Sequence, residues 1–150
     1  MEQTAFQQLA ELFPRTVHTL MKDFRSKTSE ELGLNQTQIH TMVKLQKYKS
    51  CFMGDLCRHI GLTKGSMTTV IDNLLEQGYV IRERSDTDRR KVLVRLSEKG
   101  SIVASACKTE AEQIFQERLS RLTEVEQESF RTSLATIRNV IDKMEMLENE

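Results

Sequence analysis

The sequence is poor in the residues that interrupt helices and in those that cross membranes. It has one proline, six glycines, no tryptophan and 5% aromatic residues, and its apolar runs are only a few residues long. Because a transmembrane helix needs about 20 predominantly apolar residues, we expect no membrane span. With 38% hydrophobic and 29% charged residues, a chain of 150 residues is typical of one mainly helical domain rather than of disorder.

Cysteine is scarce as well, and its three copies form no CxxC pair. Cys51, Cys57 and Cys107 are an odd number of thiols, which is typical of a reducing compartment rather than of a disulfide framework. The first residues show no basic segment followed by an apolar stretch. We therefore expect no cleaved signal peptide and a cytoplasmic location.

The formal net charge of zero conceals an uneven distribution. Residues 44–100 carry 12 Lys and Arg against 7 Asp and Glu, whereas the rest of the chain carries 10 against 15. A basic centre between acidic ends indicates that the middle of the chain contacts a polyanion such as nucleic acid.

Both ends of the chain carry narrow apolar stripes at helical spacing. The N-terminal stripe is Phe6, Leu9, Phe13, Val17, Leu20 and Phe24, and the C-terminal one is Phe130, Leu134, Ile137, Ile141 and Met144. Thr123 and Glu126 predict a capping box for the last helix. Ser97 predicts the N-cap of a long helix that precedes the last one. Gly100 would lie in the first turn of this helix, where a glycine destabilises a helix least. Packing within the chain or a helical dimer interface could bury these stripes, and we favour the dimer.

The middle of the chain predicts a different arrangement of short elements. In order, they are a helix capped by Asn35, a helix over Met53–Ile60, a Gly61-Leu62-Thr63 turn, a helix over 64–77 closed by Gly78, and strands over Val80–Arg84 and 91–96 joined by the polar run 85–90. We expect this two-stranded ribbon to be the only β structure. Two short helices joined by a glycine turn form a helix-turn-helix pattern.

The second helix of this pair separates into an apolar and a polar face. The predicted buried stripe is Met67, Val70, Ile71, Leu74 and Leu75. The predicted outward face is Lys64, Gly65, Ser66, Thr68, Thr69 and Asn73. Short polar side chains can approach base edges and phosphates, and a helix-turn-helix places its second helix in the major groove of DNA.

The hairpin that follows is strongly basic. Its cationic residues are Arg82, Arg84, Arg89, Arg90 and Lys91. A basic two-stranded wing beside a recognition helix can reach the neighbouring minor groove. The combination is a much more specific indication of DNA binding than a glycine turn between two helices.

The stretch from Leu34 to Gly100 resembles the MarR (multiple antibiotic resistance regulator) family of winged-helix transcription regulators. The most specific pieces are DNLLEQGYVIRERSDTDRRKV and the closing RLSEKG. The resemblance implies a mainly α winged-helix fold of six helices and a two-stranded wing. It also implies a DNA-binding lobe over 34–100, a helical dimerisation scaffold over 1–30 and 101–147, and an interlocked homodimer on a pseudo-palindromic operator, usually repressing transcription.

Individual positions carry the resemblance further. Asp88 and Arg90 match a wing-tip pair in which the aspartate holds the arginine toward the minor groove, beside Arg84, Arg89 and Lys91. Ser66, Thr68 and Thr69 match positions that face the major groove. Cys57 stands where alanine is common in the family.

Family members respond to small molecules, metals or oxidants, so three kinds of effector are considered. Amphipathic or aromatic ligands enter the crevice between scaffold and lobe, where this chain offers His18, Met21, Lys22, Met42 and Tyr48. No metal site is expected, because the three histidines are isolated and show no ligand spacing. For redox control Cys51 is the plausible reactive thiol, because it lies in a polar connection, whereas Cys57 is expected to be packed and inert.

Other functional classes are weaker. There is no GxGxxG, and Gly61–Ser66 lacks the ending of a phosphate-binding loop, so we expect no enzyme and no cofactor. An architectural DNA-coating protein with little sequence preference is the first alternative, and a redox-controlled regulator of the same family is another. A winged helix used only for protein contacts would not need Arg89 and Arg90 at its tip. The expected partners are double-stranded DNA, a second copy of the chain and a small-molecule effector.

Overall fold

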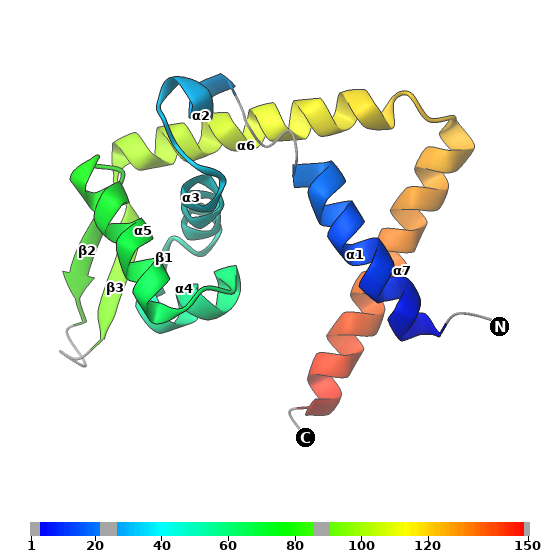
Figure 1. Cartoon of the computed structure of the whole chain (residues 1–150), viewed down its shortest axis with the longest axis horizontal. Coiled ribbons are helices and arrows are strands. Elements are labelled where there is room, and N and C mark those ends of the chain that lie inside the picture. The colour runs from blue at the N-terminus through cyan, green and yellow to red at the C-terminus, as the bar shows by residue number, and fades with distance from the viewer. Residues whose placement is uncertain (1–3, 22–26, 86–90, 149–150) are drawn as a thin grey trace. The chain divides into compact units, whose positions relative to one another are not determined.

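The computed structural model describes residues 4–21, 27–85 and 91–148, which form helices and one small sheet (Figure 1). The elements in chain order are α1 (Ala5–Met21), α2 (Lys27–Glu31), α3 (Gln36–Tyr48), β1 (Ser50–Phe52), α4 (Met53–Ile60), α5 (Lys64–Glu76), β2 (Val80–Arg84), β3 (Val92–Leu96), α6 (Glu98–Leu119) and α7 (Glu124–Glu148). The mainly helical winged-helix prediction is confirmed. The short helix α2 was not predicted and brings the described helices to seven instead of six.

The chain divides into two compact units, Met1–Glu112 and Gln113–Glu150. The first unit contains the core, in which α3, α4, α5, the sheet and the first half of α6 supply the buried residues. None of the described helices is both long and apolar enough to span a bilayer.

Helix α3 begins at the residue that the sequence indicated. The Asn35 side chain accepts a hydrogen bond from the Gln38 backbone N–H (2.9 Å), and the Gln38 side chain accepts one from the Asn35 backbone N–H (2.8 Å). This reciprocal capping box pairs two N–H groups that a helix start leaves unpaired. It fixes the start of the helix so that Ile39, Met42 and Leu45 all lie in the core.

The sheet has three strands in the order β1-β3-β2, with both neighbouring pairs antiparallel. The predicted two-stranded ribbon is present as β2 and β3, but the expectation that it would be the only β structure was wrong. The missed strand, β1, is three residues long and places Cys51 opposite Val94 of β3. Three residues are too few to show the period-2 alternation of a strand. Pairing with β3, more than 40 positions later in the chain, is what makes this segment a strand.

The two long C-terminal helices start at the predicted caps. The Ser97 hydroxyl oxygen accepts a hydrogen bond from the Gly100 backbone N–H (3.0 Å) at the start of α6. The Glu126 carboxylate accepts from the Thr123 backbone N–H (2.8 Å), and Thr123 Oγ1 accepts from the Glu126 backbone N–H (3.3 Å). The hydrogen bonds from the Thr123 backbone, and then from its side chain, lower the pKa of Glu126.

Gly100 occupies its position for a stronger reason than its place in a first helical turn. A Cβ atom built on it would lie 1.9 Å from the backbone oxygen of Tyr79. That carbonyl also accepts a hydrogen bond from the Ser97 backbone N–H (3.0 Å). The start of α6 thus packs directly on the backbone between α5 and β2, at a distance that only glycine permits.

Candidate nucleic-acid interface

Helices α4 and α5 are joined by the turn that the sequence predicted. Gly61 ends α4 in the left-handed conformation (φ 76°), and its N–H donates to the Cys57 carbonyl (2.9 Å). Thr63 then caps α5, since its Oγ1 accepts from the Ser66 backbone N–H (3.3 Å). A positive φ at Gly61 carries no Cβ penalty, which is why the turn needs only three residues.

The inner face of α5 matches the predicted stripe except at one end. Met67, Ile71 and Leu74 are fully buried and Val70 is half-buried, but Leu75 is 41% exposed. The prediction that Leu75 is buried was wrong. It lies at the edge of the stripe in the last turn of α5, where the helix ends at Glu76 and no further turn covers it.

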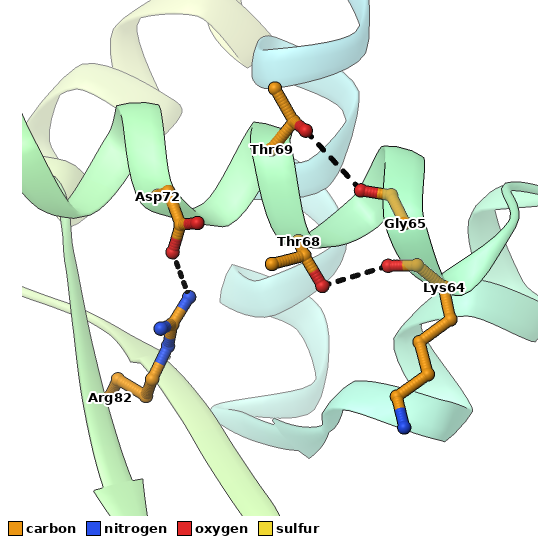
Figure 2. A network of polar contacts seen from close by, with 6 residues as sticks. All are labelled: Lys64, Gly65, Thr68, Thr69, Asp72 and Arg82. Atoms are coloured by element: carbon orange, nitrogen blue, oxygen red, sulfur yellow. Dashed lines mark hydrogen bonds and ion pairs between the residues drawn. The ribbon is translucent and has the colours of Figure 1, made fainter.

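The outer face of α5 presents the predicted polar residues. Five are exposed and one, Thr68, is half-buried; the exposed ones are Lys64, Gly65, Ser66, Thr69 and Asn73. The Thr68 hydroxyl donates to the Lys64 carbonyl (2.8 Å) and the Thr69 hydroxyl to the Gly65 carbonyl (3.3 Å) (Figure 2). Because both hydroxyl hydrogens are used within the helix, these oxygens remain acceptors toward a ligand.

The hairpin lies beside α5 and is tied to it by an ion pair. Arg82 of β2 donates to the Asp72 carboxylate on α5 (Figure 2). Sequence reasoning noted Arg82 as one of the basic hairpin residues but missed its partner. Asp72 lies four residues after Thr68 and eight after Lys64, so the helical spacing already placed it on the same side of α5 as these two residues. Lys91, just before β3, lies over the Phe52 ring, with its Nζ 5.5 Å from the ring centroid.

Only the base of the predicted wing can be placed. Arg84 is exposed at the end of β2 and Lys91 is exposed just before β3. Asp88, Arg89 and Arg90 lie outside the residues that the structure describes.

Comparisons with known proteins agree with this geometry. Residues 34–92 match the model of the MarR family. The HTH-type transcriptional regulator YcgE of Bacillus subtilis is 34% identical over 94 residues, which cover 63% of this chain and 58% of YcgE. The transcriptional repressor MprA of Escherichia coli is 28% identical over 125 residues, covering 69% of this chain and 71% of MprA. The lobe over residues 34–92 is therefore similar to the MarR family, while the chain spans 58% of the length of YcgE.

Solved structures support the family fold along nearly the whole chain. Wild-type MarR of Escherichia coli in its apo form has a TM-score of 0.74 at 20% identity, over 91% of this chain and 98% of MarR. NadR in complex with 4-hydroxyphenylacetate has a TM-score of 0.74 at 18% identity, over 91% of this chain and 96% of NadR. A MepR variant of Staphylococcus aureus bound to an oligodeoxyribonucleotide has a TM-score of 0.60 at 20% identity, over 93% of this chain and 99% of MepR. These neighbours, all below 25% identity, show that the chain has the winged-helix fold.

Cys51 is less accessible than the sequence suggested. It was expected in a polar connection but is 7% exposed in β1, with its Sγ 4.0 Å from Nδ1 of His59. Burial, and then the nearby Asp55 carboxylate, raises the pKa of the Cys51 thiol, which disfavours the thiolate. Cys107 is buried in α6, whereas Cys57 is half-buried beside the core.

Of the predicted ligand-pocket residues, Met42 and Tyr48 are the two whose side chains the structure describes. Met42 is 1% exposed and belongs to the core, so it cannot line an open crevice of this lobe. Tyr48 is stacked on His59, with 4.7 Å between ring centroids. Lys22 and the side chains of His18 and Met21 lie outside the described residues.

A groove of about 830 Å³ does run along α3, the α4–α5 connection and α6. Its apolar wall is Val43, Ile60 and Leu62, and its cations are Lys44, Lys47 and Lys108. Sequence reasoning missed this groove because α3 and α6 are about 60 positions apart in the chain. An apolar wall with a few placed charges, at this volume, is the usual constitution of a small-molecule site.

The described residues hold no cluster of three histidine, cysteine or acidic side chains that could bind a metal ion. His40 lies on the groove, where burial and then the charge of Lys44 lower its pKa. A lowered pKa favours the uncharged imidazole at neutral pH. His40 therefore offers the groove a hydrogen-bonding group and adds no positive charge to that of the lysines.

Proposed function

We propose that the chain is a regulator of the MarR family, which binds a pseudo-palindromic operator as a homodimer and represses transcription. The observation that carries the proposal is the exposed polar face of α5 beside the basic hairpin of β2 and β3. A helix with short polar side chains suits the major groove, and an adjoining basic hairpin suits the minor groove. Repression is the activity named for MprA, and MepR is the relative solved with DNA.

The homodimer is supported by apolar side chains that the single chain leaves exposed. Helix α7 has no buried residue among its 25 positions, although it carries the predicted stripe. Its exposed apolar residues include Leu134, Ile137, Val140, Ile141 and Met144. In α1, Leu9 and Phe13 of the other predicted stripe are also exposed. Faces of this length rarely remain in water, and a second copy of the chain, as the sequence predicted, covers both.

Selection of bound DNA from a random duplex pool tests the operator directly. We expect an inverted repeat whose half-sites are centred about 10 bp apart, because two recognition helices related by a two-fold axis enter successive turns of one groove. If about 8 phosphates are contacted, log K should fall with log salt at a slope near −7. Equal affinity for scrambled duplex at physiological salt would instead favour the architectural alternative.

The wing makes a separate prediction. Arg90→Ala should weaken operator binding by about 1–3 kcal/mol, since a guanidinium in the minor groove is lost. Asp88→Ala should weaken it less, because that carboxylate only orients the arginine. The measurement is fluorescence anisotropy with labelled operator, and Arg131→Ala, which removes an exposed arginine of α7, is the control. Unchanged affinity in both wing variants would show that the wing does not reach DNA.

Release from DNA is proposed to follow binding of an amphipathic anion in the groove along α3 and α6. The groove offers apolar contacts and lysines to a carboxylate, and NadR is a structural neighbour solved with an aromatic carboxylate. Lys44→Gln should leave operator affinity unchanged and raise the salicylate concentration needed for release several-fold. Lys143→Gln removes an exposed lysine of α7 and should behave like wild type. The measurement is operator anisotropy during salicylate titration.

A cysteine-free variant separates this ligand switch from redox control. Cys51→Ala, Cys57→Ala and Cys107→Ala together should preserve both operator binding and release by salicylate. If mild peroxide releases the wild type but not the cysteine-free variant, and salicylate releases neither, the ligand proposal is wrong. The redox alternative would then hold despite the burial of Cys51 and Cys107.

A further inference from the structure

A second groove, of about 480 Å³, lies on the DNA-facing side of the lobe between the start of α4, helix α5 and the hairpin. Three cationic side chains line it, Lys64, Arg82 and Lys91, and no carboxylate among the described residues does. Its remaining lining is largely uncharged and includes Phe52, Met53 and Val92. The groove therefore combines a concentration of positive charge with an apolar floor.

The cations come from different elements and are held in place. Figure 2 shows Lys64, Thr68 and Asp72 following one another along one side of α5, as their four-residue spacing requires, with Arg82 reaching that side from β2. Arg82 is held by Asp72, and Lys91 lies over the Phe52 ring. A guanidinium has five N–H donors, so pairing with one carboxylate oxygen leaves donors for a second anion.

We propose that this groove seats one backbone phosphate of the operator, at the point where the DNA strand passes from the recognition helix to the wing. The inference rests on the proposed function and specifies which surface holds the DNA backbone. A phosphate matches the charge of the groove, and the apolar floor suits the sugar beside it. Phosphate contacts fix the position of a protein on the duplex, while base contacts on the neighbouring surface provide specificity.

The assignment divides the polar residues of α5 between two tasks. Lys64 and Thr68 face the phosphate groove, together with Asp72, which positions Arg82. Gly65, Thr69 and Asn73 lie on the adjoining side, four residues apart, and remain for base edges. Thr68, which the sequence predicted among the residues facing the major groove, thus belongs to the phosphate side.

Ethylation interference on the selected operator tests the groove. Ethylating the seated phosphate should abolish binding by the wild type, and this interference should disappear in Lys64→Gln and Arg82→Gln, because their contact is already lost. The salt dependence should become shallower by about 0.9 for each phosphate contact removed, one in each half-site. Asp72→Asn should weaken the same phosphate contact without changing the preferred sequence.

Arg95→Gln is the matched control. Arg95 is also a partly exposed strand arginine in an ion pair, with Glu83 (2.7 Å). The register places Arg82 opposite Val94, so the next residue, Arg95, points to the other face of the sheet. Its footprint and salt slope should equal those of the wild type. An unchanged footprint and slope in both Lys64→Gln and Arg82→Gln, on an operator that the wild type selects, would overturn the phosphate seat and leave the proposed function intact.

Cys57 gives an independent readout because it lines this groove, while Cys51 and Cys107 are buried. Operator DNA should slow alkylation of Cys57 by iodoacetamide several-fold, and Cys57→Ala identifies the signal. Scrambled duplex at the same concentration should protect less. Equal protection by millimolar inorganic phosphate without DNA, together with unchanged ethylation footprints in the variants, would assign the groove to a free oxyanion and overturn the DNA assignment.

Discussion

Replacing Ile137 by aspartate is expected to abolish the dimer and operator binding together. Ile137 is 49% exposed in the single chain and lies in the stripe of α7 with Leu134, Ile141 and Met144. In the proposed dimer this stripe is buried, so the substitution would place an unpaired carboxylate in an apolar interface at a cost of several kcal/mol. The operator needs two lobes at a fixed spacing, and a monomer presents only one.

Sedimentation velocity and operator anisotropy measure the two effects. Asn139→Asp is the matched control, because it adds the same charge to α7 two residues away, at an exposed polar position outside the stripe. The control should sediment as a dimer and bind DNA like the wild type. A stable Ile137→Asp protein that still sediments as a dimer would remove α7 from the interface and contradict the proposed assembly.

The elements that sequence alone located are those whose limits depend on neighbouring residues. Asn35, Ser97 and Thr123 cap their helices through contacts three residues away, and Gly61 ends α4 with a positive φ. Such signals are complete within a few positions of the chain, so they can be recognised without the fold. Helix α5 and the hairpin of β2 and β3 were predicted correctly for the same reason.

Two of the errors have the opposite property, because they depend on residues distant in the chain. Strand β1 exists through pairing with β3, and that pairing buries Cys51, which a local pattern placed in a polar connection. Met42 fits a helical stripe equally well as core or as pocket wall, and only the packing of the lobe decides for the core.

The candidate site divides in the same way. The outward residues of α5 follow from helical period alone, but the Asp72–Arg82 pair and the groove around it join a helix to a strand ten residues later. Lys64 and Thr68 were therefore recognised as polar residues of one face, while their common position beside Arg82 was not. The helical period predicts which side chains share one face of α5. Which of them line a common groove with Arg82 depends on how α5 packs against β2.

Gly100→Ala is expected to destabilise the lobe more than any other glycine-to-alanine change outside the left-handed positions. The added Cβ would lie 1.9 Å from the Tyr79 oxygen and 2.8 Å from its carbonyl carbon. These are backbone atoms, and the oxygen already accepts the Ser97 N–H, so α6 must move as a whole. Overpacking of this kind costs about 1–3 kcal/mol or more. At roughly 2–4 °C per kcal/mol for a chain of this size, a melting temperature lower by about 2–12 °C is expected.

Gly65→Ala separates this clash from the general effect of removing a glycine from a helix. A Cβ on Gly65 meets no atom within 4 Å, and its φ is not positive, so alanine should be neutral or should stabilise α5 by about 0.5–1 kcal/mol. Thermal unfolding followed by circular dichroism, at equal protein concentration for both variants and the wild type, measures the difference. If Gly100→Ala unfolds at the wild-type temperature, α6 does not pack on the Tyr79 backbone as closely as the structure has it. If instead it unfolds early while Gly65→Ala does not, the contact at Tyr79 is what makes glycine necessary in the RLSEKG segment.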